Sequence, residues 1–167
     1  MQLTNNEDLR PALAGQIADD GSVRQGDRIT CYASEDIPAG AYVVQDGALE
    51  VGGRPVAKLP DAGALGRELG VSMYDPMQEQ RPAVSGVVPP LYKAGDFFVV
   101  VRKGRVWANF VGATNVVGGA TLNVRNTDGA TKGHLTGVTA DSANVATTAK
   151  AYRANVGTLV EVELNLP

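Results

Sequence analysis

The segment DFFVVVRKGRVWANFVG, residues 96–112, is strongly apolar, and it decides which fold class the sequence predicts. It contains two runs of β-branched and aromatic residues on either side of a short basic centre. Such residues are enriched in β-strands, and a glycine after a polar residue is typical of a two-residue hairpin turn. The segment therefore predicts two antiparallel strands joined by a turn at Lys103-Gly104.

The predicted hairpin has two different faces, because side chains alternate along a strand. One face is expected to lie in the core and is wholly apolar: Phe97, Val99, Val101, Val106, Ala108 and Phe110. The other face has the apolar centre and polar rim of a protein interface, formed by Phe98, Val100 and Trp107 and by Arg102 and Arg105. Two explanations stay open: a second layer of the same domain covers this face, or a neighbouring subunit does.

The rest of the chain favours the same fold class. The 167 residues include 20 Gly and 9 Pro, and valines occur in short runs between these turn residues. This spacing leaves room for short strands, whereas helical periodicity is hard to find after residue 25. We expect an all-β fold, a small β-barrel or β-sandwich, with strands at 28–33, 41–45, 48–51, 71–74, 120–126, 132–136, 145–155 and 158–166 and a short helix at 61–69. Turns are expected at 37–40, 46–47 and 52–53, where glycine ends each short motif.

The final segment, TLVEVELNL at residues 158–166, shows the clearest alternation. Val160, Val162, Leu164 and Leu166 fall on one side, and Glu161, Glu163 and Asn165 fall on the other. A period of two is typical of a half-buried strand. This strand is expected to form one wall of the core, with its acidic residues in solvent.

The chain divides into two predicted parts, an N-terminal arm at residues 1–26 and a β domain at residues 27–167. The arm is polar and broken by proline and glycine, but Leu9, Leu13 and Ile17 are spaced regularly enough to dock on a partner. A chain that begins near Val23 is therefore expected to fold with nearly unchanged thermal stability. An alternative is that residues 15–19 pack against the β domain as an integral edge. The proline-rich loop at 75–90 is long enough to serve in contacts.

Charge and hydropathy argue against two classes of partner. With 15 basic and 18 acidic residues, the net charge is −3 and the sequence pI is about 5.1, so no general field attracts nucleic acid or an anionic membrane. The longest apolar run, residues 97–101, is far shorter than the roughly 20 residues of a membrane helix. The polar start does not resemble a signal peptide, and we expect a soluble protein made in the cytoplasm.

The inventory of reactive residues predicts no enzyme, metal or cofactor. His134 is the sole histidine and Cys31 the sole cysteine, which excludes two-histidine metal sites and paired-cysteine sites. The sequence contains no phosphate-binding loop, nucleophile elbow or EF-hand loop. We expect His134 at the surface and Cys31 in the core, both without a functional role.

Five blocks in order carry a resemblance to a known family: residues 11–19 (PALAGQIAD), 37–47 (IPAGAYVVQDG), 56–60 (VAKLP), 69–75 (LGVSMYD) and 92–108 (YKAGDFFVVVRKGRVWA). This set resembles the structural cement, or capsid decoration, proteins of tailed bacteriophages. The resemblance implies a non-enzymatic virion protein on the outer surface of the phage head. It also implies a homotrimer that holds neighbouring major capsid protein subunits together.

Two other classes stay open on the sequence alone. A carbohydrate-binding β-sandwich module would present exposed aromatic residues near its loops, but one Trp and five Tyr offer few platforms. A β-barrel enzyme acting on nucleotides or sugars would have to rely on Asp, Glu, Tyr or Ser chemistry that leaves no motif.

Overall fold

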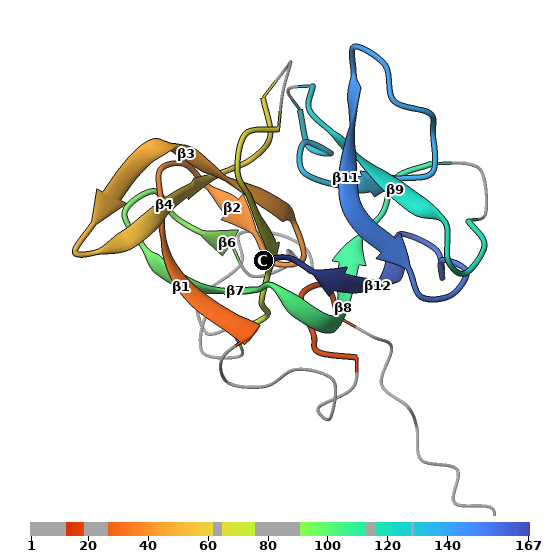
Figure 1. Cartoon of the computed structure of the whole chain (residues 1–167), viewed down its shortest axis with the longest axis horizontal. Coiled ribbons are helices and arrows are strands. Elements are labelled where there is room, and N and C mark those ends of the chain that lie inside the picture. The colour runs from red at the N-terminus through yellow and green to blue at the C-terminus, as the bar shows by residue number, and fades with distance from the viewer. Residues whose placement is uncertain (1–12, 19–26, 62–64, 76–90, 113–115, 128) are drawn as a thin grey trace, which may run out of the picture.

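The computed structural model describes residues 13–18, 27–61, 65–75, 91–112, 116–127 and 129–167 (Figure 1). The described residues form twelve β-strands and no α-helix, which confirms the all-β fold class. The predicted helix at 61–69 is wrong where it can be checked, because Glu68 and Leu69 begin a strand; residues 62–64 lie outside the described part. No helix in that part is long and apolar enough to span a membrane.

Five strands close into a barrel: β1 (Arg28–Ala33), β4 (Arg54–Lys58), β3 (Tyr42–Val51), β5 (Glu68–Ser72) and β7 (Phe97–Val101), in that order. β1 and β4 are parallel, and the other neighbours are antiparallel. The short strands β2 (Ile37–Pro38) and β6 (Leu91–Tyr92) pair with each other, and Ile37 and Tyr92 pack into the barrel core. Closure leaves the barrel without free edges.

A second sheet of five strands has the order β10 (Leu135–Thr136), β9 (Thr121–Arg125), β11 (Asn144–Ala151), β12 (Leu159–Asn165) and β8 (Lys103–Asn109). All its pairs are antiparallel. As predicted, the apolar side chains of β12 are buried, with Val160 and Val162 fully inaccessible to solvent. This sheet lies beside the barrel (Figure 1).

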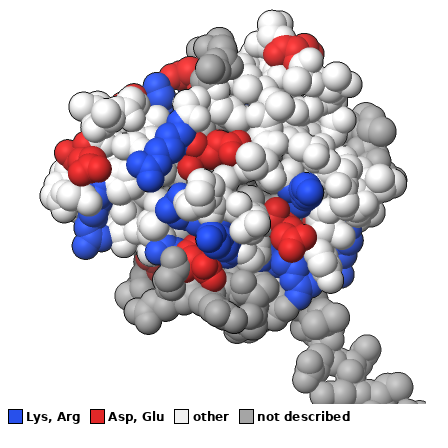
Figure 2. Space-filling view, viewed as in Figure 1, with Lys and Arg blue, Asp and Glu red and all other residues white. Residues whose placement is uncertain are grey.

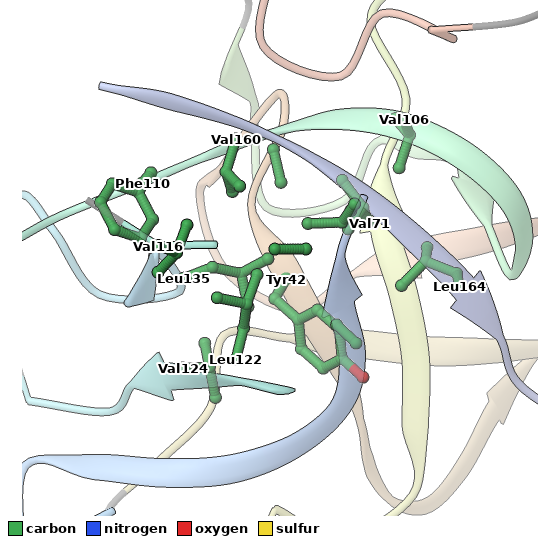
Figure 3. Close-up of a cluster of buried hydrophobic side chains, with 14 of the residues drawn as sticks. Tyr42, Val71, Val106, Phe110, Val116, Leu122, Val124, Leu135, Val160 and Leu164 are labelled. Atoms are coloured by element: carbon green, nitrogen blue, oxygen red, sulfur yellow. The ribbon is translucent and has the colours of Figure 1, made fainter. Parts of the chain in front are cut away.

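The core between the sheet and the barrel is the larger of two buried clusters (Figure 3). Tyr42 and Val71 point out of the barrel wall and meet Leu122, Val160 and Leu164 of the sheet. Hydrogen bonds also join the layers: the Tyr42 amide donates to the Gly133 carbonyl oxygen at 2.9 Å, and Asn109 Nδ2 donates to the Ala39 carbonyl oxygen at 2.8 Å. Close-packed layers of this kind make a rigid body.

The predicted hairpin at residues 96–112 is wrong. β7 pairs with β1 and β5 inside the barrel, whereas β8 pairs with β12 along seven residues of the second sheet. Arg102 is the crossing point, where its amide donates to Asp27 and its carbonyl oxygen accepts from Leu166. Each of the two strands therefore belongs to a different sheet and is stabilised by neighbours that are distant in sequence. An isolated two-stranded hairpin would be only marginally stable.

The structure confirms one of the predicted glycine turns and contradicts another. Gly52 and Gly53 have φ of 59° and 71° between paired Val51 and Arg54, which confirms the predicted two-residue turn. The predicted turn at Asp46-Gly47 is wrong, since β3 runs through it and absorbs the extra residues in a bulge between Gln45 and Glu50. The bulge bends the far half of β3, which is exposed to solvent.

Residues 13–18 lie against the edge of β8. Ile17 bridges Val106, and the amides of Gly15 and Ala18 donate to the carbonyl oxygens of Trp107 and Arg105 at 2.6 and 3.0 Å. These contacts support the alternative in which residues 15–19 form an integral edge, for residues 15–18 at least. The boundary at residue 26 stays a prediction, and Leu9 lies outside the described residues.

Candidate interaction surfaces

The first candidate surface is a row of side chains across the outer face of the barrel. Phe97 on β7 is directly opposite Tyr32 on β1, and Tyr32 is opposite Val56 on β4. The Tyr32 and Phe97 rings meet edge to face at 5.4 Å, and the Arg54 guanidinium lies 5.6 Å from the centre of the Phe97 ring. Phe97 remains 52% exposed, so the row forms an apolar surface that these neighbours hold in place.

The β3–β4 ribbon extends this row. Leu49 and Val51 are two apart on β3, so they share a face, and Val51 is paired with Arg54. They are 59% and 38% exposed, high values for large aliphatic side chains. We call this surface the barrel patch: Tyr32, Leu49, Val51, Arg54 and Phe97.

The second candidate surface is at the opposite end of the long axis, where the segment before β9 meets the segment between β11 and β12 (Figure 1). The Val116 amide donates to Asn155 Oδ1 at 3.1 Å, and the Gly119 amide donates to the Ala151 carbonyl oxygen at 2.7 Å. These bonds fix Val117 and Val156, which are 71% and 66% exposed, on neighbouring loops. We call this pair the loop patch.

The third candidate surface is on the outer face of the second sheet. Arg153 Nε lies 2.5 Å from one carboxylate oxygen of Glu161, and an Arg105 nitrogen lies 3.6 Å from the other. The Arg153 guanidinium lies 5.0 Å from the centre of the Trp107 ring, and that of Arg105 lies 4.3 Å from the centre of the Tyr152 ring. We call these five residues the sheet cluster.

The described residues place Cys31 and His134 apart from any metal-ligating cluster. No group of three His, Cys, Asp or Glu side chains among them is arranged to hold a metal ion. Burial raises the pKa of the Cys31 thiol to about 12, so the thiol stays neutral inside the barrel. Burial, and secondly the charge of Arg125, lower the pKa of His134, which is partly buried rather than on the open surface as predicted.

Charges of both signs are mixed over the face in Figure 2, and the area over β9 and β11 is largely uncharged. Several charges neutralise each other: Lys58 Nζ lies 3.2 and 2.7 Å from carboxylate oxygens of Asp46 and Asp61, and Lys93 Nζ lies 2.7 Å from Asp36. No single-sign field covers this face, in agreement with the small net charge.

The structure separates the residues that the sequence placed on one interface. Phe98 and Val100 are 3% and 0% exposed inside the barrel, so the expectation that they form a surface is wrong. The adjacent Phe97, predicted for the core, is the exposed residue. The face assignment on β7 was wrong for Phe97, Phe98 and Val100, because the barrel interior, and not a hairpin, determines which side of the strand is buried. It was correct for Val101, which is 0% exposed in the core between the barrel and the second sheet.

The other predicted interface residues differ in their surroundings. Trp107 is only 9% exposed, beneath Arg153, and Arg105 pairs with Glu161 on the sheet. Arg102 lies at the crossing between the layers and Arg105 is opposite Glu163 on β12, so the two arginines do not flank a hairpin turn as predicted. Leu13 is 40% exposed and Ile17 is partly buried against the core.

Sequence reasoning missed the barrel patch and the loop patch. Leu49 and Val51 fall in a run interrupted by Glu50, and Val117 and Val156 stand among glycine, alanine and asparagine. Their only signal was an apolar residue next to a turn. That signal is weak, because single exposed apolar residues are common on soluble proteins.

These features define a class first: an all-β protein in which a closed barrel packs against a second sheet and carries exposed apolar patches. A family model described as structural cement protein (E217 gp24/Pam3 gp6) matches residues 1–165. The chain therefore belongs to the phage structural cement protein family, which confirms the resemblance drawn from the sequence and supports a structural, capsid-stabilising role.

One solved structure shares the fold along nearly the whole chain. It is a chain from the capsid of Myoviridae phage XM1, with 15% sequence identity, a TM-score of 0.59 and coverage of 98% of each chain. No curated protein sequence matches the chain. Family membership favours the structural role over the carbohydrate-binding and enzyme interpretations.

Proposed function

We propose that this protein binds the outer surface of a phage head as a homotrimer and clamps neighbouring major capsid protein subunits together. The observation that carries the proposal is the presence of two exposed apolar patches, the barrel patch and the loop patch, at opposite ends of one rigid body. A protein that bridges two subunits needs two separated contact surfaces and a body that does not bend between them. The family match supports the capsid as the partner.

The rigidity comes from the contacts between the layers. Besides the shared apolar core, Thr148 on β11 donates its hydroxyl to Glu68 Oε2 on β5 at 2.7 Å, and the Thr148 amide donates to Glu68 Oε1 at 3.1 Å. These contacts hold the barrel patch and the loop patch in a fixed relative position. Relative motion of the layers would have to break both the core and these bonds.

The trimer adds to the clamp through avidity. Three copies joined in one body present each patch three times, and linked sites commonly bind about 10² to 10⁴ times more tightly than one site. Each patch can then be small and weak in isolation. This accounts for apolar surfaces that are exposed but not extensive enough to make the free protein aggregate.

The test uses phage heads that lack this protein, to which purified protein is added. We expect saturable binding at a fixed ratio to the major capsid protein, and heads that break at a higher temperature. Leu49→Ser with Phe97→Ser removes the barrel patch, and Val117→Ser with Val156→Ser removes the loop patch. Each pair should weaken binding at least tenfold and abolish the thermal protection.

Val138→Ser is the matched control, because Val138 is 46% exposed and belongs to neither patch. It should bind and protect like the unmodified protein. Wild-type protein that does not bind heads, or protection that survives the loss of either patch, would contradict the clamp. Light scattering that shows only monomers, in solution and after release from heads, would contradict the trimer.

A further inference from the structure

We propose that the sheet cluster, formed by Arg105, Trp107, Tyr152, Arg153 and Glu161, is a recognition site for carboxylate side chains on the capsid subunit. The inference rests on the proposed function and names the chemistry of one contact. It concerns side chains that belong to neither apolar patch, although Tyr152 and Arg153 lie on the same segment as Val156 of the loop patch.

The starting observation is a buried carboxylate on the solvent side of a sheet. Glu161 points away from the core, as its alternation with Val160 and Val162 requires, and the neighbouring Glu163 on the same face is exposed. Glu161 is nevertheless only 2% exposed. Two arginines and two aromatic rings enclose it, so that each guanidinium lies near both the carboxylate and a ring.

Stability does not account for this arrangement. Removing a carboxylate from water costs several kcal/mol, and the attraction of its partners in a buried ion pair does little more than offset that cost. Glu161 does, however, hold two arginine side chains in one geometry. An arginine that is already ordered loses less conformational entropy when it binds, so the partner is bound more tightly.

The residue types also point to a binding site. Tryptophan, tyrosine and arginine are the residues most enriched among those that dominate binding energy at protein interfaces. Arg153 has a side chain that is 59% exposed, and Tyr152 is 48% exposed, so both can meet a partner. A stacked guanidinium can still donate paired hydrogen bonds to a carboxylate, the geometry that arginine supplies and lysine does not.

The local charge selects the sign of the partner. Arg105 on β8 is opposite Glu163 on β12, which is opposite Lys150 on β11, and Lys103 is two residues from Arg105 on the same face. Among the described residues of β8, β11, β12 and the segment after β11, this face carries four positive and two negative side chains, Arg153 and Glu161 included, on a chain whose net charge is −3. The face is therefore basic within an acidic protein, and it fits carboxylates.

The experiment measures the affinity of variants for heads that lack this protein, at 50 and 200 mM salt. Arg153→Gln should weaken binding about tenfold and reduce the dependence of binding on salt. Arg153→Lys keeps the charge but loses the planar fork, and should recover only part of the loss. Lys93→Gln is the matched control, since Lys93 is an exposed, ion-paired cation on the segment between β6 and β7, and it should bind like the wild type.

Glu161→Gln distinguishes binding by arginines that Glu161 holds in place from binding by the positive charge of the face alone. Removing this negative charge makes the face more basic, so attraction alone predicts tighter binding, whereas loss of order in the two arginines predicts weaker binding. Thermal melting checks that each variant is folded, and the exposed Arg153 provides the test if Glu161→Gln does not fold.

The outcomes distinguish this inference from the proposed function. Arg153→Gln that binds like wild type, or Glu161→Gln that binds more tightly, overturns the carboxylate site while the clamp stands. A loss of binding that accompanies a loss of the trimer assigns the cluster to the interface between copies and overturns the inference. Wild-type protein that does not bind heads overturns both.

Discussion

Gln16 and Trp107 are hydrogen-bonded as neighbouring strands: the Trp107 amide donates to the Gln16 carbonyl oxygen at 2.9 Å. The next bond in the ladder runs from the Gly15 amide to the Trp107 carbonyl oxygen, and the Gly15 carbonyl oxygen accepts from Tyr74 at 2.8 Å. One short segment therefore covers the edge of β8 and ties it to the residues that follow β5. An uncovered edge is a site for aggregation, so this segment protects the fold.

Truncation tests this role. From the sequence we expected a chain that begins at Val23 to keep its thermal stability. The structure predicts the opposite, because the truncation removes the four backbone hydrogen bonds of residues 15–18, worth about 2 to 6 kcal/mol together. The melting temperature should fall by at least about 5 °C, and calorimetry measures it.

A chain that begins at Leu13 is the matched control for that truncation. It keeps the paired segment and should melt like the full chain, but it lacks Leu9. If residues 1–12 contact the capsid, its affinity for heads should fall at least tenfold, which is about 1.4 kcal/mol. Equal melting temperatures for both truncations would show that the pairing of residues 15–18 contributes little.

Gly15 is the residue of this segment that tolerates substitution least. Its φ is +80°, and a Cβ atom there would lie 2.5 Å from the Tyr74 amide nitrogen and 2.6 Å from the Ser72 carbonyl oxygen. Gly15→Ala should therefore lower the free energy of unfolding by about 2 to 4 kcal/mol. Gly47 has φ of +58° with no atom within 4 Å, so Gly47→Ala should lower it by only about 1 kcal/mol. Urea denaturation of both variants separates the cost of the steric clash at Gly15 from the cost of a positive φ alone. Similar losses of stability in the two variants would contradict a steric clash at Gly15.

Two adjacent phenylalanines should respond in opposite ways. Phe98→Ala removes a side chain that is 3% exposed and stacks on Tyr92 at 4.9 Å, and should lower the free energy of unfolding by about 3 to 5 kcal/mol. Phe97→Ala, at a residue that is 52% exposed, should lower it by less than about 1 kcal/mol. Denaturant titration measures both free energies of unfolding. A larger loss of stability for Phe97→Ala than for Phe98→Ala would show that Phe97 is the buried residue, as the hairpin predicted.

His134 should make stability fall on mild acidification. Its pKa in the folded protein lies below the unfolded value of about 6.5, so the unfolded chain binds the proton more readily. The stabilisation is complete above pH 6.5 and is lost as the pH falls below that value. His134→Gln should flatten the stability curve between pH 7 and pH 5. An unchanged slope in urea titrations across this range would assign the loss to other groups.

The sequence predicted those strands whose pattern depends only on neighbouring residues. The predictions of a strand at residues 28–33 and of the alternation of Val160, Val162 and Leu164 were correct. In a half-buried strand the alternation of apolar and polar residues can be seen in the residues of that strand alone. The turn at Gly52-Gly53 was correct for a related reason, since two positive φ angles in succession favour glycine. Family membership, too, could be inferred from ordered blocks of sequence.

What the sequence did not determine is which strands pair. Residues 97–109 read as one hairpin because the chain is locally symmetric about Lys103-Gly104, but β7 belongs to the barrel and β8 to the second sheet. Glu161 shows the same limit on a smaller scale: alternation placed it in solvent, and side chains from β8 and from the segment after β11 enclose it. The periodicity of a strand depends on neighbours along the chain, and so the sequence alone determines it. Pairing and burial depend on groups that are distant along the chain, and for this reason only the tertiary structure decided the barrel, its exposed patches and the sheet cluster.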